Sequence, residues 1–187
     1  EDPIEYKNEN ITQLEVNNKR DRTFHKLLRA ILRQDPDILY IGEIRDEETA
    51  EVAFRSAITG HVVFSTLHTK DINSTFDRIL DLNINENLMN EALKTVINQR
   101  LVKTLCADCR KKVEAPKWLK EKGINFVYEA VGCGRCDNGY KGRVGVYEVN
   151  VIDDGEVQTI MNFEDSLVEH LKNGKIDLKT FEVENDL

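Results

Sequence analysis

The sequence has no G-x-x-x-x-G-K-[ST] loop, the glycine-rich turn whose backbone holds nucleotide phosphates. It has no apolar run long enough to cross a bilayer, and no segment resembles a signal peptide. Lys and Arg number 26 against 34 Asp and Glu, a net charge of −8 that argues against nucleic acid as the main partner. These absences favour a soluble globular protein, which we expect to be cytoplasmic, with docking on a membrane protein left open.

Cysteine is present in a specific pattern. Two C-x-x-C pairs, Cys106 with Cys109 and Cys133 with Cys136, are separated by 23 residues. Each pair can offer two thiolates to one tetrahedral ion, so the spacing predicts a structural Zn²⁺ site with four cysteine ligands and no place for water. Two disulfides are disfavoured in a cytosolic chain, and thioredoxin-like redox chemistry needs only one pair.

The hydrophobic pattern of the first hundred residues alternates between helix and strand periods. We predict helices from Thr23 to Pro36, over 46–59, after Asp71 and over about 86–104, and strands at 38–42 and 61–68. Both strands are apolar on both faces, which is typical of a parallel sheet covered on each side. The sequence therefore predicts an α/β fold in which these two strands are neighbours.

The remaining segments give weaker signals. Residues 1–22 suit an edge strand or a hairpin, and residues 143–149 read as a strand. The tail from residue 150 is acidic and sparse in large apolar groups, with one helix expected near 164–173.

A carboxylate and an imidazole follow the two predicted strands. Glu43 comes directly after the first strand and His68 after the second, at the edge where open α/β sheets hold ligands. A carboxylate there can orient or deprotonate water, and an imidazole can bond a phosphate. The alternatives are a structural acid paired with Arg45 and an ordinary loop histidine. We expect His61, at the opposite strand end, to be structural.

Four arginines are candidates for phosphate or subunit contacts: Arg29, Arg33, Arg45 and Arg78. The guanidinium fork matches phosphate geometry and can act across a subunit boundary. A solvated helix face is the alternative for each of them.

Several stretches of residues 1–149 together resemble one family. They are EDPIEY, LRAILRQDPDILYIGEIRDEETAEVAF, TGHVVFSTLHT, QRLVKTLCADC and GYKGRVGVYEV. This combination resembles the traffic ATPases of type II secretion and type IV pilus assembly. The matching motifs are an Asp box (Glu1, Asp2, Glu5), an atypical Walker B (Gly42, Glu43), a His box (Thr66, His68) and the pair Arg29 and Arg33.

The resemblance implies a RecA-like (P-loop NTPase) partial core that hydrolyses ATP with Mg²⁺ in a homo-hexamer. By the same resemblance, Glu43 is the Walker B glutamate and Glu1 an acid near magnesium and water. Asp2, Thr66 and the four arginines match nucleotide or interface positions. The Walker A loop and an N-terminal domain are expected upstream of residue 1, so we expect the 187-residue chain alone to be inactive.

The resemblance also implies partners and a location. These are an inner-membrane platform or assembly protein and peripheral attachment to the inner face of the cell membrane. We expect three parts: core residues 1–105, a cysteine module over 106–142, and a return strand and tail over 143–187. The four cysteines favour an assembly or export motor over a retraction motor. The alternatives are a non-catalytic, zinc-stabilised interaction domain on a RecA-like scaffold and a zinc-ribbon nucleic-acid binder.

Overall fold

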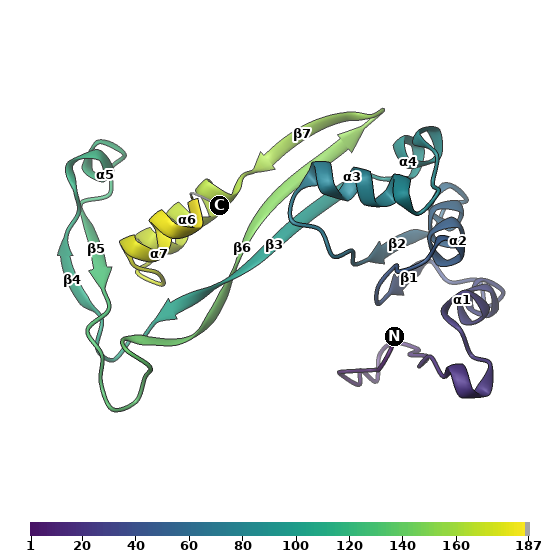
Figure 1. Ribbon diagram of the computed structural model, residues 1–187, viewed down its shortest axis with the longest axis horizontal. Helices are drawn as coiled ribbons and strands as arrows, with labels where there is room; N and C mark the ends of the chain where they lie inside the picture. Colours follow the sequence, from purple (N-terminus) through teal and green to yellow (C-terminus); the bar gives the residue numbers. More distant parts are fainter. Residues whose placement is uncertain (186–187) are drawn as a thin grey trace. The chain divides into compact units, whose positions relative to one another are not determined.

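The structure, a computed structural model, describes residues 1–185 (Figure 1). The chain divides into two compact units. Unit 1 comprises Glu1–Val96 with Ile152–Val157, and unit 2 comprises Ile97–Val151 with the segment from Gln158 onward. Contacts therefore group the cysteine-rich segment with the tail that follows it, a grouping that the three-part division expected from the sequence does not include.

Unit 1 is an α/β arrangement built on two parallel strands. Its elements are η1 (Asn18–Arg20), α1 (Phe24–Leu32), β1 (Ile38–Ile41), α2 (Glu47–Ile58), β2 (Val62–Ser65), α3 (Ile72–Asp81) and α4 (Glu86–Ala92). Asp46 and Asp71 cap α2 and α3 by accepting the backbone N–H groups of Thr49 and Ser74. Ile38 pairs with Val62 in parallel register, which confirms the predicted neighbouring strands.

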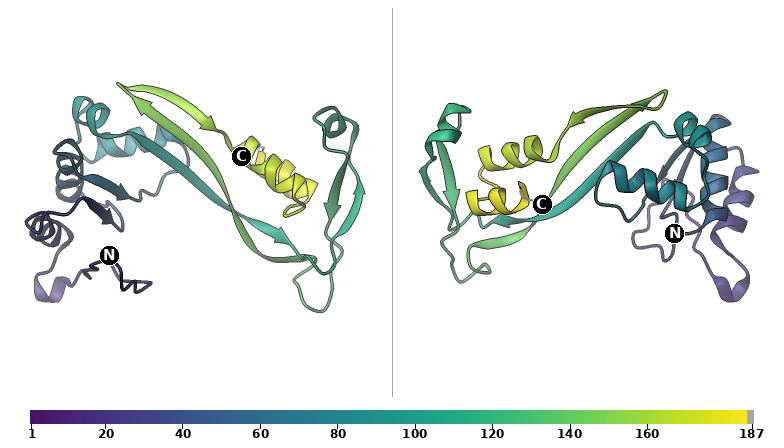
Figure 2. Two further views of the ribbon diagram at one scale, coloured as in Figure 1. Left: turned by 180° about the vertical axis from the view of Figure 1, so that it is seen from behind. Right: turned by 45° about the horizontal axis from the view of Figure 1, so that its top comes forward.

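The helices of unit 1 cover one face of this two-stranded sheet (Figures 1 and 2). Leu39 and Ile41 of β1 point into a core that they share with side chains of all four α-helices. The alternate side chains of both strands are 51 to 63% exposed: Ile38, Tyr40, Val62 and Phe64. The prediction of burial on both faces is therefore wrong within residues 1–185, because the described elements cover only one of them.

Two other predictions for this region are also wrong. The helix expected over 86–104 ends at Ala92, and β3 (Thr95–Leu105) follows it. Burial in β3 alternates along most of the strand, with Val96 buried and Ile97 exposed, so a period of two replaces the helical period. Residues 1–22 form no strand beyond one isolated bridge between Asn17 and Arg22.

Unit 2 joins strands from the middle of the chain to two C-terminal helices. The elements that lie wholly or mostly in it are β4 (Lys111–Glu114), α5 (Lys117–Glu121), β5 (Phe126–Glu129), β6 (Tyr140–Asp153), β7 (Glu156–Met161), α6 (Phe163–Lys172) and α7 (Leu178–Asn185). The strand order is β3-β6-β7 in one sheet, and β4 pairs with β5 in an antiparallel hairpin. The strand predicted at 143–149 lies within β6 and the helix predicted near 164–173 is α6, whereas β7 and α7 were not predicted.

The C-terminal helices close the core of unit 2. Leu119 and Val127 from the hairpin segment pack in one cluster with Leu167, Leu171 and Phe181 of α6 and α7. All five are 0 to 3% exposed. The tail is sparse in apolar residues, but Leu167, Leu171 and Phe181 are all buried in this core, while Val157, Ile160 and Val183 stay exposed.

Arg110 links the hairpin to the end of α6. Its guanidinium donates to the carbonyl oxygen of Gly174 and lies 4.6 Å from the ring centroid of Tyr128. Gly174 has φ +62°, and a Cβ placed there would meet the Tyr128 ring at 2.5 Å. The end of α6 therefore requires glycine for two independent reasons. No helix within residues 1–185 is long and apolar enough to cross a membrane.

Candidate functional site

Glu43 follows β1 after Gly42, and its side chain is 15% exposed. One carboxylate oxygen, Oε1, lies 2.5 Å from the Arg45 guanidinium. The other, Oε2, is buried and accepts no hydrogen bond from any described residue. The Nε2 atom of His68 lies 3.5 Å from Oε2. The structure thus brings Glu43 and His68 together as the sequence predicts, and it also forms the Arg45 pair that was the structural alternative.

Arginine keeps the Glu43 carboxylate ionised. The hydrogen bond from Arg45 lowers the pKa of Glu43, and the charges of Arg45 and of protonated His68 act in the same direction, while burial opposes them. The same hydrogen bond raises the pKa of Arg45. At neutral pH Glu43 is therefore an anion with one oxygen engaged and the other able to accept a proton or a hydrogen bond.

Backbone and hydroxyl contacts hold the segments after β1 and β2 together. The Thr66 hydroxyl donates to the Gly42 carbonyl oxygen at 2.6 Å, and the Ile44 N–H donates to the Thr66 carbonyl oxygen at 3.1 Å. Thr66 was expected at a nucleotide or interface position, and in this structure its hydroxyl binds the backbone beside Glu43. This double contact fixes the loop that carries Glu43 relative to the loop that carries His68.

The first residues of the chain lie beside the same loop. A Cβ placed on Gly42 would be 3.5 Å from the Cα and 3.6 Å from the Cγ of Glu1. The Val16 N–H donates to the Glu1 carbonyl oxygen at 2.9 Å, which helps to hold Glu1 there. Asp2 is exposed, and its charge contributes to the raised pKa of Arg45. Glu5 is exposed as well and forms no ion pair within residues 1–185.

The four candidate arginines separate into two pairs. Arg78 donates from Nη2 to the Arg45 carbonyl oxygen at 3.4 Å, so these two lie beside Glu43. Arg29 and Arg33 are exposed on and just after α1, and neither guanidinium forms a hydrogen bond or an ion pair within the described chain. The first pair belongs to the Glu43 site, and the second is free to contact another molecule.

A depression of about 570 Å³ adjoins the site. Its lining residues are His68, Thr69, Lys70, Ser74, Asp77, Arg78 and Asp81. Apart from His68 and Arg78, sequence reasoning missed these residues. Their position directly after His68 and along the following helix α3 was the available signal. The Nδ1 atom of His61 donates a hydrogen bond to the Ser56 carbonyl oxygen, 3.0 Å away, as a structural histidine does.

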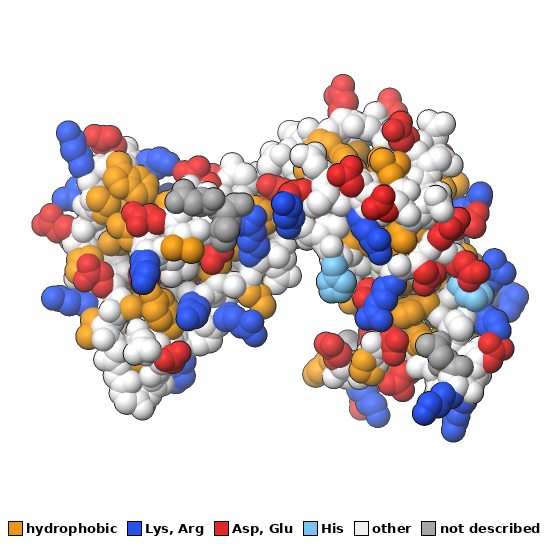
Figure 3. Space-filling view, viewed as in Figure 1, with side chains coloured by type: hydrophobic (Ala, Val, Ile, Leu, Met, Phe, Trp, Pro, Cys, Tyr) orange, Lys and Arg blue, Asp and Glu red, His pale blue; other side chains and the backbone are white. Residues whose placement is uncertain are grey.

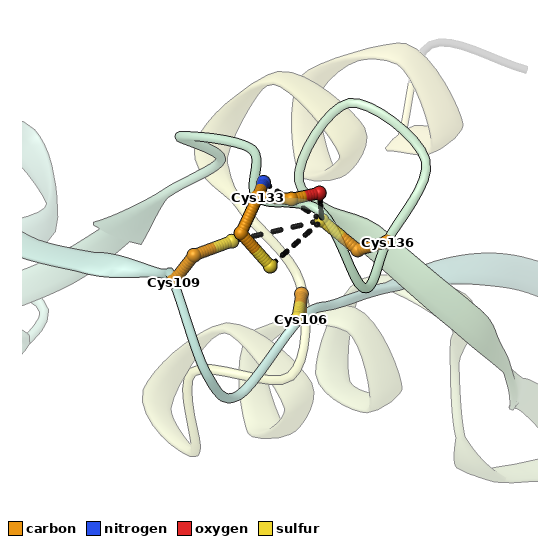
Figure 4. Close-up of side chains that lie close together, drawn as sticks. All are labelled: Cys106, Cys109, Cys133 and Cys136. Carbon is orange, nitrogen blue, oxygen red and sulfur yellow. Dashed lines mark hydrogen bonds between the residues drawn. The ribbon is translucent and has the colours of Figure 1, made fainter.

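The four cysteines converge from two loops. Cys106 and Cys109 follow β3, and Cys133 and Cys136 precede β6, with their side chains pointing toward one another (Figure 4). The four sulfur atoms lie within 4.8 Å of each other, with 3.6 Å between Cys133 and Cys136 and 3.8 Å between Cys109 and Cys136. Four sulfurs around one Zn²⁺ at roughly 2.3 Å would be about 3.8 Å apart, so the donor set fits this ion.

The thiols of this cluster are electrostatically unequal. Burial raises the pKa of Cys136, but hydrogen bonds with the Cys133 backbone and side chain and with the Gly139 backbone outweigh burial and lower it to about 7. Burial, with hydrogen bonds to neighbouring thiols, raises the pKa of Cys109 to about 12. The Cys136 thiolate is therefore readily formed, whereas the Cys109 thiol needs a nearby cation to lose its proton near neutral pH.

Comparison with known proteins gives concordant results. The family described as Type II/IV secretion system protein matches residues 1–182. Type II secretion system ATPase E of Vibrio cholerae is 45% identical over 161 residues, 82% of this chain and 32% of that protein. Type IV pilus assembly ATPase PilB of Pseudomonas aeruginosa is 42% identical over 192 aligned positions, 96% of this chain and 34% of that protein. The chain thus spans about a third of the length of these curated relatives.

Solved structures agree on the fold. The pilus retraction motor PilT with bound ADP aligns with a TM-score of 0.64 at 28% identity, covering 97% of this chain and 50% of that one. The Legionella pneumophila ATPase DotB aligns with a TM-score of 0.65 at 20% identity, covering 98% of this chain and 49% of that one. The α/β fold with its parallel strand pair is that of this group of ATPases.

Proposed function

Because this chain belongs to the type II/IV secretion system protein family, we propose that it is the C-terminal part of a hexameric cytoplasmic ATPase that powers pilin or pseudopilin assembly. Two relatives that support the proposal are named as ATPases of type II secretion and of type IV pilus assembly. Since the chain spans about a third of their length, we assign ATP hydrolysis, the hexamer and the membrane partner to a longer protein.

The observation that carries the proposal is the state of Glu43. A buried carboxylate oxygen without a hydrogen-bond donor costs free energy, and such an atom in a native fold calls for an explanation. We propose that Oε2 accepts a hydrogen bond from the water that attacks the terminal phosphate of ATP. Arg45 engages Oε1, so it fixes the direction in which Oε2 points and keeps the carboxylate ionised.

Neighbouring side chains suit the other requirements of phosphoryl transfer. Glu1 and Asp2 add carboxylates beside the Glu43 loop, and we assign them to the Mg²⁺ that neutralises phosphate charge when nucleotide is bound. His68 is exposed and lies 3.5 Å from Glu43, where its imidazole is placed to bond a phosphate oxygen. Thr66 keeps the loops that carry Glu43 and His68 in register.

The arginines supply contacts across the proposed hexamer. Arg29 and Arg33 have no partners within the described residues, so they are the pair that we assign to a neighbouring subunit. Arg45 and Arg78 stay with the Glu43 site of their own chain. We further propose that an inner-membrane platform or assembly protein holds the hexamer at the inner face of the cell membrane.

The cysteine cluster holds one structural zinc ion in this proposal. Cys106, Cys109, Cys133 and Cys136 provide four sulfur donors, which leaves no coordination position for water or substrate. The ion would therefore stabilise unit 2 and take no part in ATP chemistry. The presence of this cluster favours an assembly or export motor over a retraction motor.

Glu43→Gln in the longer protein tests the catalytic assignment. Glutamine keeps the size of the side chain and its ability to accept a hydrogen bond but removes the base and the charge. We expect ATP to bind normally and turnover to fall by about 10² to 10⁴ fold. The matched control is Glu51→Gln on α2, where the carboxylate only pairs with exposed Arg55, and its turnover should be unchanged. Near-normal turnover of Glu43→Gln would contradict the role.

Mixed hexamers test the arginines. If Arg29 or Arg33 of one subunit completes the Glu43 site of the next, mixing an inactive Arg29→Ala or Arg33→Ala protein with inactive Glu43→Gln protein should restore measurable turnover.

The alternative of a non-catalytic interaction domain predicts that the longer wild-type protein hydrolyses no ATP at all. The 187-residue chain alone should hydrolyse ATP negligibly in either case.

A further inference from the structure

Within the cysteine cluster, Cys133 and Cys136 are held together by three contacts. Their sulfur atoms lie 3.6 Å apart, and the backbone N–H of Cys133 donates to the Cys136 sulfur at 3.3 Å. The Cys136 sulfur also lies 3.5 Å from the Cys133 carbonyl oxygen. One C-x-x-C loop therefore keeps its two sulfur atoms facing each other, an arrangement from which a disulfide forms with little movement of the chain.

This pair is also more accessible than the first cysteine of the cluster. Cys106 is 1% exposed, whereas Cys133 and Cys136 are both partly exposed. Between them, the Arg135 side chain is 73% exposed, and a Cβ placed on Gly134 would meet no atom within 4 Å. Figure 3 shows mainly backbone and uncharged polar atoms at the lower end of unit 2, where Figure 1 places the loop of this pair. A small solute can therefore reach the pair from solvent.

The turn between α6 and α7 is attached to residues that adjoin the other two cysteines. Leu105, the residue before the first cysteine, donates its backbone N–H to the Lys175 carbonyl oxygen at 2.7 Å. Arg110, the residue after the second cysteine, donates to the Gly174 carbonyl oxygen. Ile176, the next residue of the turn, is 0% exposed and belongs to the core of unit 2. The segment that leads into α7 is therefore held by the same stretch of chain that carries two of the cysteines.

A second set of hydrogen bonds connects the start of α7 with β6. The Gly139 carbonyl oxygen accepts the Cys106 N–H at 2.8 Å, which joins the two cysteine loops. The next residue, Tyr140, donates from its hydroxyl to Asp177 Oδ2 at 2.6 Å. Asp177 Oδ1 in turn accepts the Thr180 N–H at 2.9 Å, in the first turn of α7. A cluster that holds both loops closed therefore also holds α7 in place.

We propose that Cys133 and Cys136 form a redox switch, in which hydrogen peroxide joins their sulfur atoms in a disulfide, ends metal binding at the cluster and releases α7. The inference rests on the zinc site of the proposed function. The two thiolates lose two electrons as the sulfur–sulfur bond forms, and one hydrogen peroxide takes up these electrons and two protons to give two molecules of water. Cys106 and Cys109 then remain as two donors, too few for a four-coordinate structural site.

A dithiol reductant reverses the step. It attacks one sulfur of the disulfide, forms a mixed disulfide with the chain, and leaves as its own disulfide while both cysteine thiols are restored. Disulfides that form in a reducing cytosol are usually transient and redox-sensing, so a reversible bond fits the compartment that we propose. The switch would loosen unit 2 under oxidative conditions without using any residue of the Glu43 site.

Peroxide treatment of the zinc-loaded 187-residue chain tests the switch. We expect loss of the bound zinc to a chromogenic chelator, a disulfide between Cys133 and Cys136 in peptide maps, and a loss of hydrogen-exchange protection that is largest in α7. The ring centroids of Trp118, the single tryptophan, and Phe181 of α7 lie 6.0 Å apart, so Trp118 fluorescence should shift to the red as α7 leaves. Dithiothreitol with added zinc should reverse these changes.

Two histidine variants separate the disulfide from the metal site. Cys133→His removes one member of the pair but supplies another zinc ligand, because imidazole nitrogen binds zinc as thiolate does. This variant should keep its zinc at peroxide concentrations that empty the wild type. Cys109→His is the matched exchange outside the pair, and it should lose its zinc to peroxide with formation of the same disulfide.

Three results with wild-type protein would overturn the switch, whether or not a histidine variant folds. The first is retention of zinc at peroxide concentrations that oxidise free glutathione. The second is a first disulfide that includes Cys106 or Cys109, and the third is loss of zinc while α7 stays fully protected. Reduced protein purified without zinc would instead refute the zinc site on which the switch depends.

Discussion

Unit 1 and unit 2 have cores of similar size, but they differ in how those cores are closed. In unit 2 helix α6 contributes Leu167 and Leu171, both at most 1% exposed, to the core that it shares with the hairpin segment. In unit 1 the outer face of β1 and β2 keeps Tyr40 and Phe64 more than half exposed. A sheet face with this many exposed apolar side chains is suited to contact with another protein surface. Unit 1 is therefore open on this face, whereas the core of unit 2 is closed by its own chain. The Glu43 site thus lies in the open unit, and the cysteine cluster lies in the closed one.

The largest expected effect is that of the metal. Structural zinc contributes binding free energy on the order of 10 kcal/mol to small domains, and that energy becomes part of folding. We expect Cys133→Ser, or chelation of wild-type protein, to release one zinc ion per chain and to destabilise unit 2 by several kcal/mol. Hydrogen exchange should show loss of protection over 97–151 and 158–185, while β1 and β2 stay protected.

Elemental analysis gives the companion measurement. Reduced wild-type protein should contain one zinc per chain, and a protein without zinc would refute the metal assignment. Equal loss of protection in unit 1 would instead show that the two units do not unfold separately.

An effect of intermediate size is expected from a buried variant in unit 2, compared with an exposed variant in unit 1. Leu171 is fully buried in unit 2, so Leu171→Ala should cost about 3 kcal/mol through lost contacts and a cavity. Phe64 is 57% exposed in unit 1, so Phe64→Ala should change the unfolding free energy by less than about 1 kcal/mol. Urea unfolding followed by Trp118 fluorescence for unit 2 and by circular dichroism for both units measures the two costs. Similar costs would mean that the outer face of unit 1 is covered in solution.

The smallest effect is a pH dependence confined to unit 2. The Tyr140 hydroxyl donates to Asp177 Oδ2 at 2.6 Å, and burial followed by this hydrogen bond raises the pKa of Tyr140. The unfolded chain therefore loses this proton at about pH 10, whereas the folded chain loses it only at a higher pH. The stabilisation that is fully present below pH 10 is lost as the pH rises from there through the pKa of the folded state. The thermal stability of unit 2 should fall above that pH, and Tyr140→Phe should reduce the slope of stability against pH. Tyr40→Phe on the exposed face of β1 is the control and should leave the slope unchanged.

The sequence was most informative where one local pattern decided the outcome. Asp46 and Asp71 cap the helices predicted after them, and the spacing of Cys133 and Cys136 predicted the thiol cluster. Glu43 and His68 could be placed together because parallel strands end at a common edge. These inferences need only short stretches of chain or the direction of two neighbouring strands.

The predictions failed where distant residues decide the structure. Residues 95–105 have apolar side chains at spacings that fit a helix, and pairing with β6 selects the strand instead. The contact of Thr66 with Gly42 and that of Arg110 with Gly174 join residues 24 and 64 positions apart. Contacts of this kind have no local signal, so neither of them could have been inferred from spacing.

The junction of Arg110, Tyr128 and Gly174 has a consequence for sequence divergence. The positive φ of Gly174 and the ring 2.5 Å from its missing Cβ leave no room for a side chain while Tyr128 is present. Arg110 in turn depends on both neighbours, because it lies over the ring and donates to the glycine carbonyl. These three positions should therefore covary among homologues. A relative with a side chain at position 174 should carry a small residue at 128 and should often have lost the arginine at 110 as well.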